Sequence, residues 1–396
     1  MQKQKEPVWL KIIRILLGCL FIFSGLMKAI DPIASAIKID EYFISFGMDF
    51  MHPFSMFFGV CLSTAEFALG FMLLFRIYVR FTADIYLLFM SFFLLLTAWL
   101  AVAEHLEIHY GYDFGVVKDC GCFGQAVAMS NLQTFLKNVI VIIPTIIIFA
   151  KRKSIPDIRL NFWGQFCYMW LGAIIAFAIQ FYCYRHLPFI DFSDWKKGDN
   201  VAEAFVDQPA EKSILYIYQK TEDSSLVYLS EDEMMAMYDS VPDFDQQYTY
   251  VDRKDSIIRD LVRAKIPGFT MTDAAGGEHS FELINVNNDV PLYLLFMHNL
   301  SETNLDGLQS ENLKSLIAYC EKNHYNFVGI TNSSDEEIAE FCKTNDITFP
   351  IFHNAIDLVK GPFMVRDAVR SNPGLIKIQN GIVQDKWAWR DFPSGE

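Results

Sequence analysis

The sequence predicts a multi-domain membrane protein, in which an all-α bundle of transmembrane helices is followed by an α/β soluble domain. Five long apolar runs occupy the first half of the 396 residues, and each is near the roughly 20 residues that a helix needs to cross the hydrocarbon core. Charge is split between the halves. Residues 1–190 carry a net charge of +3, whereas residues 191–396 carry −17. The second half is therefore a soluble acidic region, which lacks the clustered cations that binding to nucleic acid requires.

The apolar runs cover residues 9–27, 54–75, 81–103, 132–150 and 162–184. A single run of this kind could be a buried core helix of a soluble protein, but five in succession favour membrane spans. Leu16-Leu17-Gly18-Cys19 resembles a lipoprotein cleavage box. Only four residues separate Arg14 from Cys19, too few for a signal sequence, so we expect an uncleaved first helix.

Lys and Arg in the short connections set the expected orientation, because they concentrate on the cytoplasmic side. They precede the first run and occupy the connections between runs two and three and between runs four and five. These residues are Lys3, Lys5, Lys11, Arg14, Arg76, Arg80, Lys151, Arg152, Lys153 and Arg159. We therefore expect the bacterial inner membrane, a cytoplasmic N-terminus, and a periplasmic location for residues 104–131 and the C-terminal domain. Disulfides are permitted in that compartment.

The second half predicts a mixed sheet with helices on its faces. Strands are expected at 213–218, 226–229, 247–251, 292–297, 327–331 and 349–352, helices at 305–323 and 335–345, and hairpins around 275–277 and over 374–387. We divide the chain into a four-helix membrane domain (1–153), a fifth membrane helix (154–190), a linker with a small β-rich extension (191–262) and an α/β domain (263–396).

Cys120 and Cys122 differ from the other six cysteines because they lie close together in a polar loop between two apolar runs. Gly121 between them has the backbone freedom to bring the two sulfur atoms together. A disulfide across one residue is strained, and strained disulfides exchange readily. Lys118 would favour a thiolate here and Asp119 would oppose it. The first interpretation is therefore a redox pair, with Lys118 tuning the thiolate.

Two other interpretations of the cysteines remain open. His105 and His109 share a face of the helix that extends beyond the third run, and with the two cysteines they would form a Cys₂His₂ set suited to zinc. Alternatively, one cysteine of the pair holds the loop through a structural disulfide. Inside the second run, Glu66 is a candidate functional carboxylate, because buried charge in a membrane is costly. The alternative for Glu66 is a carboxylate satisfied by neighbouring hydroxyl groups or an Arg.

The first four runs resemble the DoxX/DoxD superfamily of small membrane proteins. The segments that carry the likeness are Ser24-Gly25-Leu26-Met27-Lys28 and Asp119-Cys120-Gly121-Cys122-Phe123-Gly124. The cysteine element is similar in particular to the MauE branch, whose members are associated with disulfide formation during methylamine dehydrogenase maturation. Over residues 9–150 the resemblance implies a redox role for Cys120 and Cys122.

The C-terminal half resembles thioredoxin-like domains of the TlpA or peroxiredoxin kind. The matching segments are Ile266-Pro267-Gly268-Phe269-Thr270, residues 292–297, Phe349-Pro350-Ile351-Phe352 and Asn372-Pro373-Gly374-Leu375-Ile376. Such domains carry a Cys-x-x-Cys or one reactive Cys after the first central strand, where this chain has His298-Asn299-Leu300-Ser301. The resemblance implies a degenerate site, with His298 as an exposed loop residue, Ser301 as a helix cap and Pro373 as the cis-proline.

Two functional hypotheses follow. In the first, the chain is a membrane-anchored thiol–disulfide redox protein that supports maturation of envelope proteins through Cys120 and Cys122, and so a possible oxidoreductase. In the second, it is a non-enzymatic subunit or scaffold of an envelope complex with a degenerate docking domain. The expected partners are the lipid bilayer and an extracytoplasmic protein client. No cofactor is evident, because no Gly-rich dinucleotide fingerprint and no quinone or haem motif is present.

Overall fold

A bundle of apolar helices forms the first half of the molecule. The computed structural model describes residues 6–112, 114–115, 117, 120–125, 127, 129–207, 211–259, 262–355 and 364–395. The helices of the bundle are α1 (Val8–Ile30), α2 (Pro32–Ser45), α3 (Ser55–Phe75), α4 (Val79–Tyr110), α5 (Asn131–Lys151) and α6 (Phe162–Arg185). Within the described residues, five of these are long and apolar enough to cross a membrane, and α2 is the exception. The five predicted spans are confirmed as helices.

Glycines allow α1 and α3 to pack with their backbones nearly in contact. A methyl group at Gly25 would lie 2.5 Å from the backbone nitrogen of Phe67, and one at Gly70 would lie 2.7 Å from the carbonyl oxygen of Gly18. Small residues at crossing points are the usual means by which membrane helices approach closely. The contact at Gly25 brings Ser24, the residue before it, within hydrogen-bond distance of Glu66.

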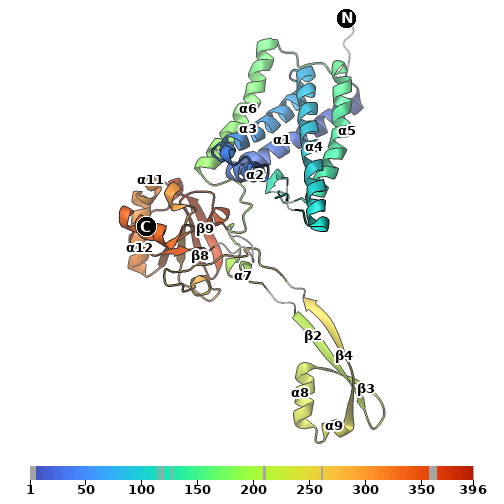
Figure 1. Cartoon of the computed structure of the whole chain (residues 1–396), viewed down its shortest axis with the longest axis vertical. Coiled ribbons are helices and arrows are strands. Elements are labelled where there is room, and N and C mark those ends of the chain that lie inside the picture. The colour runs from blue at the N-terminus through green and yellow to red at the C-terminus, as the bar shows by residue number, and fades with distance from the viewer. Residues whose placement is uncertain are drawn as a thin grey trace.

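Two sheets form the second half of the chain (Figure 1). The three-stranded sheet has the order β3-β2-β4, and the five-stranded sheet has the order β7-β6-β5-β8-β9. Their strands are β2 (Glu211–Lys220), β3 (Leu226–Ser230), β4 (Tyr248–Arg259), β5 (Leu292–Met297), β6 (Asn326–Thr331), β7 (Ile351–His353), β8 (Gly374–Gln379) and β9 (Ile382–Ala388). The α/β architecture predicted for this half is therefore confirmed.

The three-stranded sheet is an arm that projects away from both the bundle and the larger sheet (Figure 1). It carries α8 (Glu231–Ser240) and α9 (Phe244–Gln247). All its pairings are antiparallel. The strands predicted here are confirmed, with β2 and β4 longer than expected, whereas α8 was not predicted.

The central strand of the larger sheet is buried on both faces. Leu292, Leu294 and Phe296 of β5 point into one core together with Trp195, and the alternate residues point into a second core under α12 (Glu311–Asn323). This alternation is the two-residue period of a strand covered on both sides. β5 pairs with β6 in parallel register and with β8 in antiparallel register. The connection from β5 to β6 contains α12, which covers one face of the sheet.

One prediction in this region is wrong in detail. The helix expected at 305–323 is split into α11 (Leu305–Leu308) and α12, because Ser310 caps a new helix by accepting from the backbone of Leu313. The turn expected around 275–277 is present, but its two arms share one antiparallel bridge, between Thr272 and Glu278, and are too short to count as strands. By contrast, α13 (Asp335–Asn345) and the β8–β9 hairpin lie where they were predicted.

The larger sheet is attached to the end of the bundle through a buried ion pair. Arg370, in the loop that leads into β8, contacts Asp31 between α1 and α2 at 3.0 Å, and both side chains are less than 10% exposed. His186, just after α6, contacts Asp391 at 2.9 Å. The loop before β8 therefore lies against the membrane domain.

Candidate functional site

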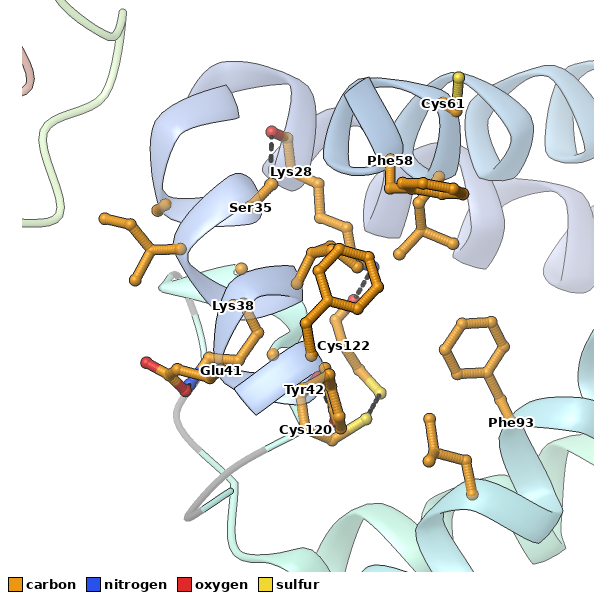
Figure 2. Close-up of a pocket in the computed structure, with 18 of the residues that line it drawn as sticks. Lys28, Ser35, Lys38, Glu41, Tyr42, Phe58, Cys61, Phe93, Cys120 and Cys122 are labelled. Carbon is orange, nitrogen blue, oxygen red and sulfur yellow. Dashed lines mark hydrogen bonds and ion pairs between the residues drawn. The ribbon is translucent and has the colours of Figure 1, made fainter. Parts of the chain in front are cut away.

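The two cysteines of the Cys-Gly-Cys loop lie side by side in the reduced form. Their Sγ atoms are 3.0 Å apart, and both cysteines are free thiols. Gly121 between them has a φ of +63°, a left-handed conformation that glycine adopts at little cost. Figure 2 shows both sulfur atoms pointing into a space that Phe93 lines from the opposite side. The pair that the sequence analysis singled out is thus brought together.

Three carbonyl groups of the loop are anchored by side chains of the bundle. Asn131 Nδ2 donates to the carbonyl of Val117 at 3.0 Å. Tyr42 Oη donates to the carbonyl of Cys120 at 3.3 Å, and Lys28 Nζ donates to the carbonyl of Cys122 at 2.5 Å. The cysteine pair therefore has a fixed position relative to α1, α2 and α5.

Lys28 and Glu66 form a buried ion pair next to the backbone of Cys122. Lys28 Nζ is 2.7 Å from Glu66 Oε2, and both side chains are 7% exposed. Lys28 also donates to Ser24 Oγ at 3.0 Å. Glu66, Ser24 and the carbonyl of Cys122 thus accept one hydrogen bond each from the ammonium group of Lys28. All three of its N–H groups are used. Ser24 Oγ lies within 2.8 Å of Glu66 Oε2 and 2.7 Å of the same carbonyl.

Glu66 is thus satisfied by a hydroxyl and a cation, and the cation is Lys28 rather than an Arg. Lys28 belongs to a segment that carries the family resemblance, but the sequence indicated no role for it. The signal that could have identified it is its spacing: Ser24 and Lys28 are four residues apart, so they share a helix face at the end of α1.

The hydrogen bond between the thiols makes the two cysteines unequal. The Cys120 thiol, as donor, holds the pKa of Cys122 below its ordinary value, and Lys137 and Lys28 act in the same direction, whereas burial and Glu66 oppose it. The same hydrogen bond, reinforced by burial, raises the pKa of Cys120. Cys122 is therefore the cysteine of the pair that loses its proton more readily. Lys118, the residue predicted to tune the thiolate, lies outside the described residues together with Asp119.

A large cavity opens beside the pair, between α2, α3 and α4. Its volume is about 920 Å³, and most of its lining is apolar. Cys120, Cys122 and Lys28 contribute to one end, and Phe93 and Leu96 of α4 to another wall. Figure 2 shows how the side chains of α2 and α3 surround this space. The helix α2, which the sequence analysis did not predict, supplies an entire wall.

The zinc set is not assembled within the part of the chain that the structure describes. No group of three or more His, Cys, Asp or Glu side chains there is placed to hold a metal ion. His105 and His109 stack on each other near the end of α4, with ring centroids 4.1 Å apart, and His109 Nδ1 contacts the carbonyl of His105.

The segment that follows β5 differs from the sequence-based expectation in two respects. His298 is not an exposed loop residue: its Nε2 contacts the carbonyl of Val369 at 2.7 Å, and burial lowers its pKa to about 4. Ser301 is not the cap, because Asn299 accepts from the backbone N–H of Ser301, which lies inside a short 3₁₀ turn. The peptide bond before Pro373 is cis, as predicted.

The fold and the site define a membrane protein with a helical bundle, a cysteine pair at its end and an α/β region beyond. Its first part is MauE-like: the family model described as methylamine utilisation protein MauE matches residues 7–151. Protein TlpB of Flavobacterium psychrophilum is 27% identical over 182 residues, which are 46% of this chain and 46% of TlpB. The match thus spans about half of each protein. No solved structure matches the chain significantly.

Proposed function

We propose that this chain is a membrane-anchored thiol–disulfide redox protein that acts on extracytoplasmic proteins through Cys120 and Cys122. The observation that carries the proposal is the contact of the two sulfur atoms at 3.0 Å, in a loop whose backbone is anchored by the Lys28–Glu66 ion pair. When the pair is reduced, exchange with a disulfide needs a thiolate that attacks and a second thiol that resolves the mixed disulfide. Cys122, with its lowered pKa, suits the first role and Cys120 the second.

The chemistry is a thiol–disulfide exchange in which the pair is either donor or acceptor of a disulfide. If the pair is oxidised, a client thiolate attacks one sulfur, the Cys120–Cys122 bond breaks, and a second client thiolate releases the client with its new disulfide. Sulfur oxidation states balance, because the client loses two electrons and the pair gains them. The inner membrane with a periplasmic loop is the location we propose for this reaction, since that compartment permits disulfides.

We also propose the four-part division at residues 153, 190 and 262, with a thioredoxin-like domain at 263–396. The strand order β7-β6-β5-β8-β9 supports it. His298 replaces the nucleophile, so redox chemistry in this proposal belongs to the membrane domain, and the soluble domain has a binding or structural role.

Thiol trapping in membranes tests the proposal. Alkylation before and after reduction should reveal a pair that changes state between oxidising and reducing conditions. Cys120→Ser retains a hydroxyl that can donate to Cys122, so this variant should accumulate mixed disulfides with a client, whereas Cys122→Ser should form few. A pair that never changes state, with both variants fully functional, would instead support the alternative of a non-enzymatic envelope subunit.

A further inference from the structure

The cavity beside the cysteines opens sideways into the region that lipid would fill. Phe92 of α4 and Phe58 of α3 both line it and are 59% and 39% exposed. Both belong to helices long and apolar enough to cross a membrane, so this exposure is toward hydrocarbon rather than water. At about 920 Å³, the cavity lies within the roughly 300–1,000 Å³ range of small-molecule sites.

The polar groups of the cavity are concentrated where the sulfur atoms lie. Cys120, Cys122, Lys28 and Tyr42 all line it, and Figure 2 places Tyr42 next to the cysteine pair. Ser35, Lys38, Glu41, Glu66 and Asp367 also line the cavity, and the rest of the lining is mainly apolar. A ligand that fits such a site has a polar, redox-active head and an apolar body that extends toward the lipid.

The charges at the polar end compensate each other within the protein. Lys28 is paired with Glu66 at 2.7 Å, and Lys38 with Glu41 at 2.6 Å. Recognition of a phosphate depends on a cation that is free to pair with it. An anionic headgroup would meet no net positive charge at this end of the cavity. A neutral head is favoured.

We propose that the cavity binds a lipid-soluble quinone, which oxidises the Cys120–Cys122 pair. This inference rests on the proposed function and names the electron acceptor of that same site. Both S–H bonds break and one S–S bond forms, so that the pair gives up two electrons and two protons. The quinone accepts them, and its two carbonyl groups become the hydroxyl groups of a hydroquinone. The regenerated disulfide is then available to a client.

Single-turnover reduction of decylubiquinone by the full-length protein tests this inference. The protein, purified in detergent and reduced with dithiothreitol, is desalted and mixed with decylubiquinone. Hydroquinone formation is followed by ultraviolet absorbance, and remaining thiols are counted by maleimide labelling. We expect one quinone to be reduced for every two thiols lost. Cys122→Ser should retain quinone binding, measured by quenching of tryptophan fluorescence, and lose the reduction.

A matched pair of tryptophan substitutions separates the cavity from the lipid-facing surface. Leu96 lines the cavity, whereas its neighbour Leu95 is 72% exposed and does not contribute to the lining. Leu96→Trp should slow quinone reduction at least tenfold and leave exchange with a soluble disulfide, oxidised glutathione, unchanged. Leu95→Trp should affect neither.

The outcomes distinguish this inference from the proposed function. If the wild-type protein exchanges with oxidised glutathione but neither binds nor reduces decylubiquinone, the quinone site is refuted and the redox function stands. Equal rates of quinone reduction for Leu96→Trp and wild type would also refute the quinone site. So would native mass spectrometry that shows a bound phospholipid which quinone fails to displace. If glutathione exchange is absent as well, the proposed function itself fails.

Discussion

Lys28 satisfies a buried carboxylate and fixes the backbone of the reactive loop at the same time. Its partners are Glu66, Ser24 and the carbonyl of Cys122. Removing one member of a buried ion pair leaves an uncompensated charge, which is far more costly than replacing both. The ion pair therefore links the stability of the bundle to the geometry of the two thiols.

Replacement of Lys28 by Met should destabilise the protein by about 3–5 kcal/mol, since Glu66 would remain charged and buried. The double variant Lys28→Met/Glu66→Met should recover most of that loss, while the loop, deprived of its anchor, becomes more reactive toward maleimide. Thermal unfolding in detergent and labelling rates of Cys122 measure the two effects. Additive losses of stability would contradict the assignment of the ion pair.

His298 is predicted to make the soluble region sensitive to mild acid. Its pKa is lowered from 6.5 to about 4 in the folded protein by burial, so the unfolded state binds a proton first as the pH falls. The contribution of His298 to the free energy of unfolding is fully present above pH 6.5. It is lost as the pH falls from 6.5 to 4, by up to about 3 kcal/mol. His298→Gln, whose amide donates at every pH, should reduce this dependence when hydrogen exchange of β5 is measured at pH 7 and 4.5.

At the scale of elements, the close packing of α1 against α3 positions the site. Ser24 and Glu66 face each other because each precedes a residue of the closest backbone contact, Gly25 and Phe67. The sequence predicted the spans from apolar length alone, but the contact between two helices depends on which small residues align, and a single sequence does not determine that. The helix α2 was not predicted because its 14 residues are shorter than a span.

Gly25→Ala should destabilise the bundle, although Ala normally stabilises a helix by about 1 kcal/mol relative to Gly. The added methyl group would lie 2.5 Å from a backbone atom of α3, which cannot move aside. Gly172→Ala is the matched control, because the three atoms nearest to its methyl group belong to the side chain of Phe71 rather than to a backbone. Melting temperatures of the two variants in detergent provide the comparison; equal values would refute the role of Gly25.

Across the whole molecule, most elements of the soluble half were predictable because its strands alternate or are uniformly apolar and its turns carry Gly or Asn. β5, β8 and α13 lie at the predicted residues. The mutual position of the two halves was not predictable, because it depends on Arg370 and Asp31, which are 339 residues apart and have no local signature. The cavity was unpredictable for the same reason, since its walls come from separate helices.

Arg370→Ala should loosen the soluble half from the bundle, because Asp31 would remain buried without its cation, at a cost of about 3–5 kcal/mol. Faster proteolysis near residues 187–200 and faster hydrogen exchange of α2 would reveal the loosening. Arg390→Ala removes an exposed contact with the carbonyl of Arg185 at 3.4 Å and the stacking of the guanidinium on Trp389, but no buried ion pair, and serves as the control. Identical cleavage rates for both variants would contradict the clamp.

The loop before β8 carries both Val369, whose carbonyl contacts His298, and Arg370, which is held by Asp31. The end of the larger sheet at which β8 begins consequently faces the protein's own membrane half. A protein that binds the soluble region would therefore use a different surface. The three-stranded sheet, which projects away from the bundle, offers one (Figure 1).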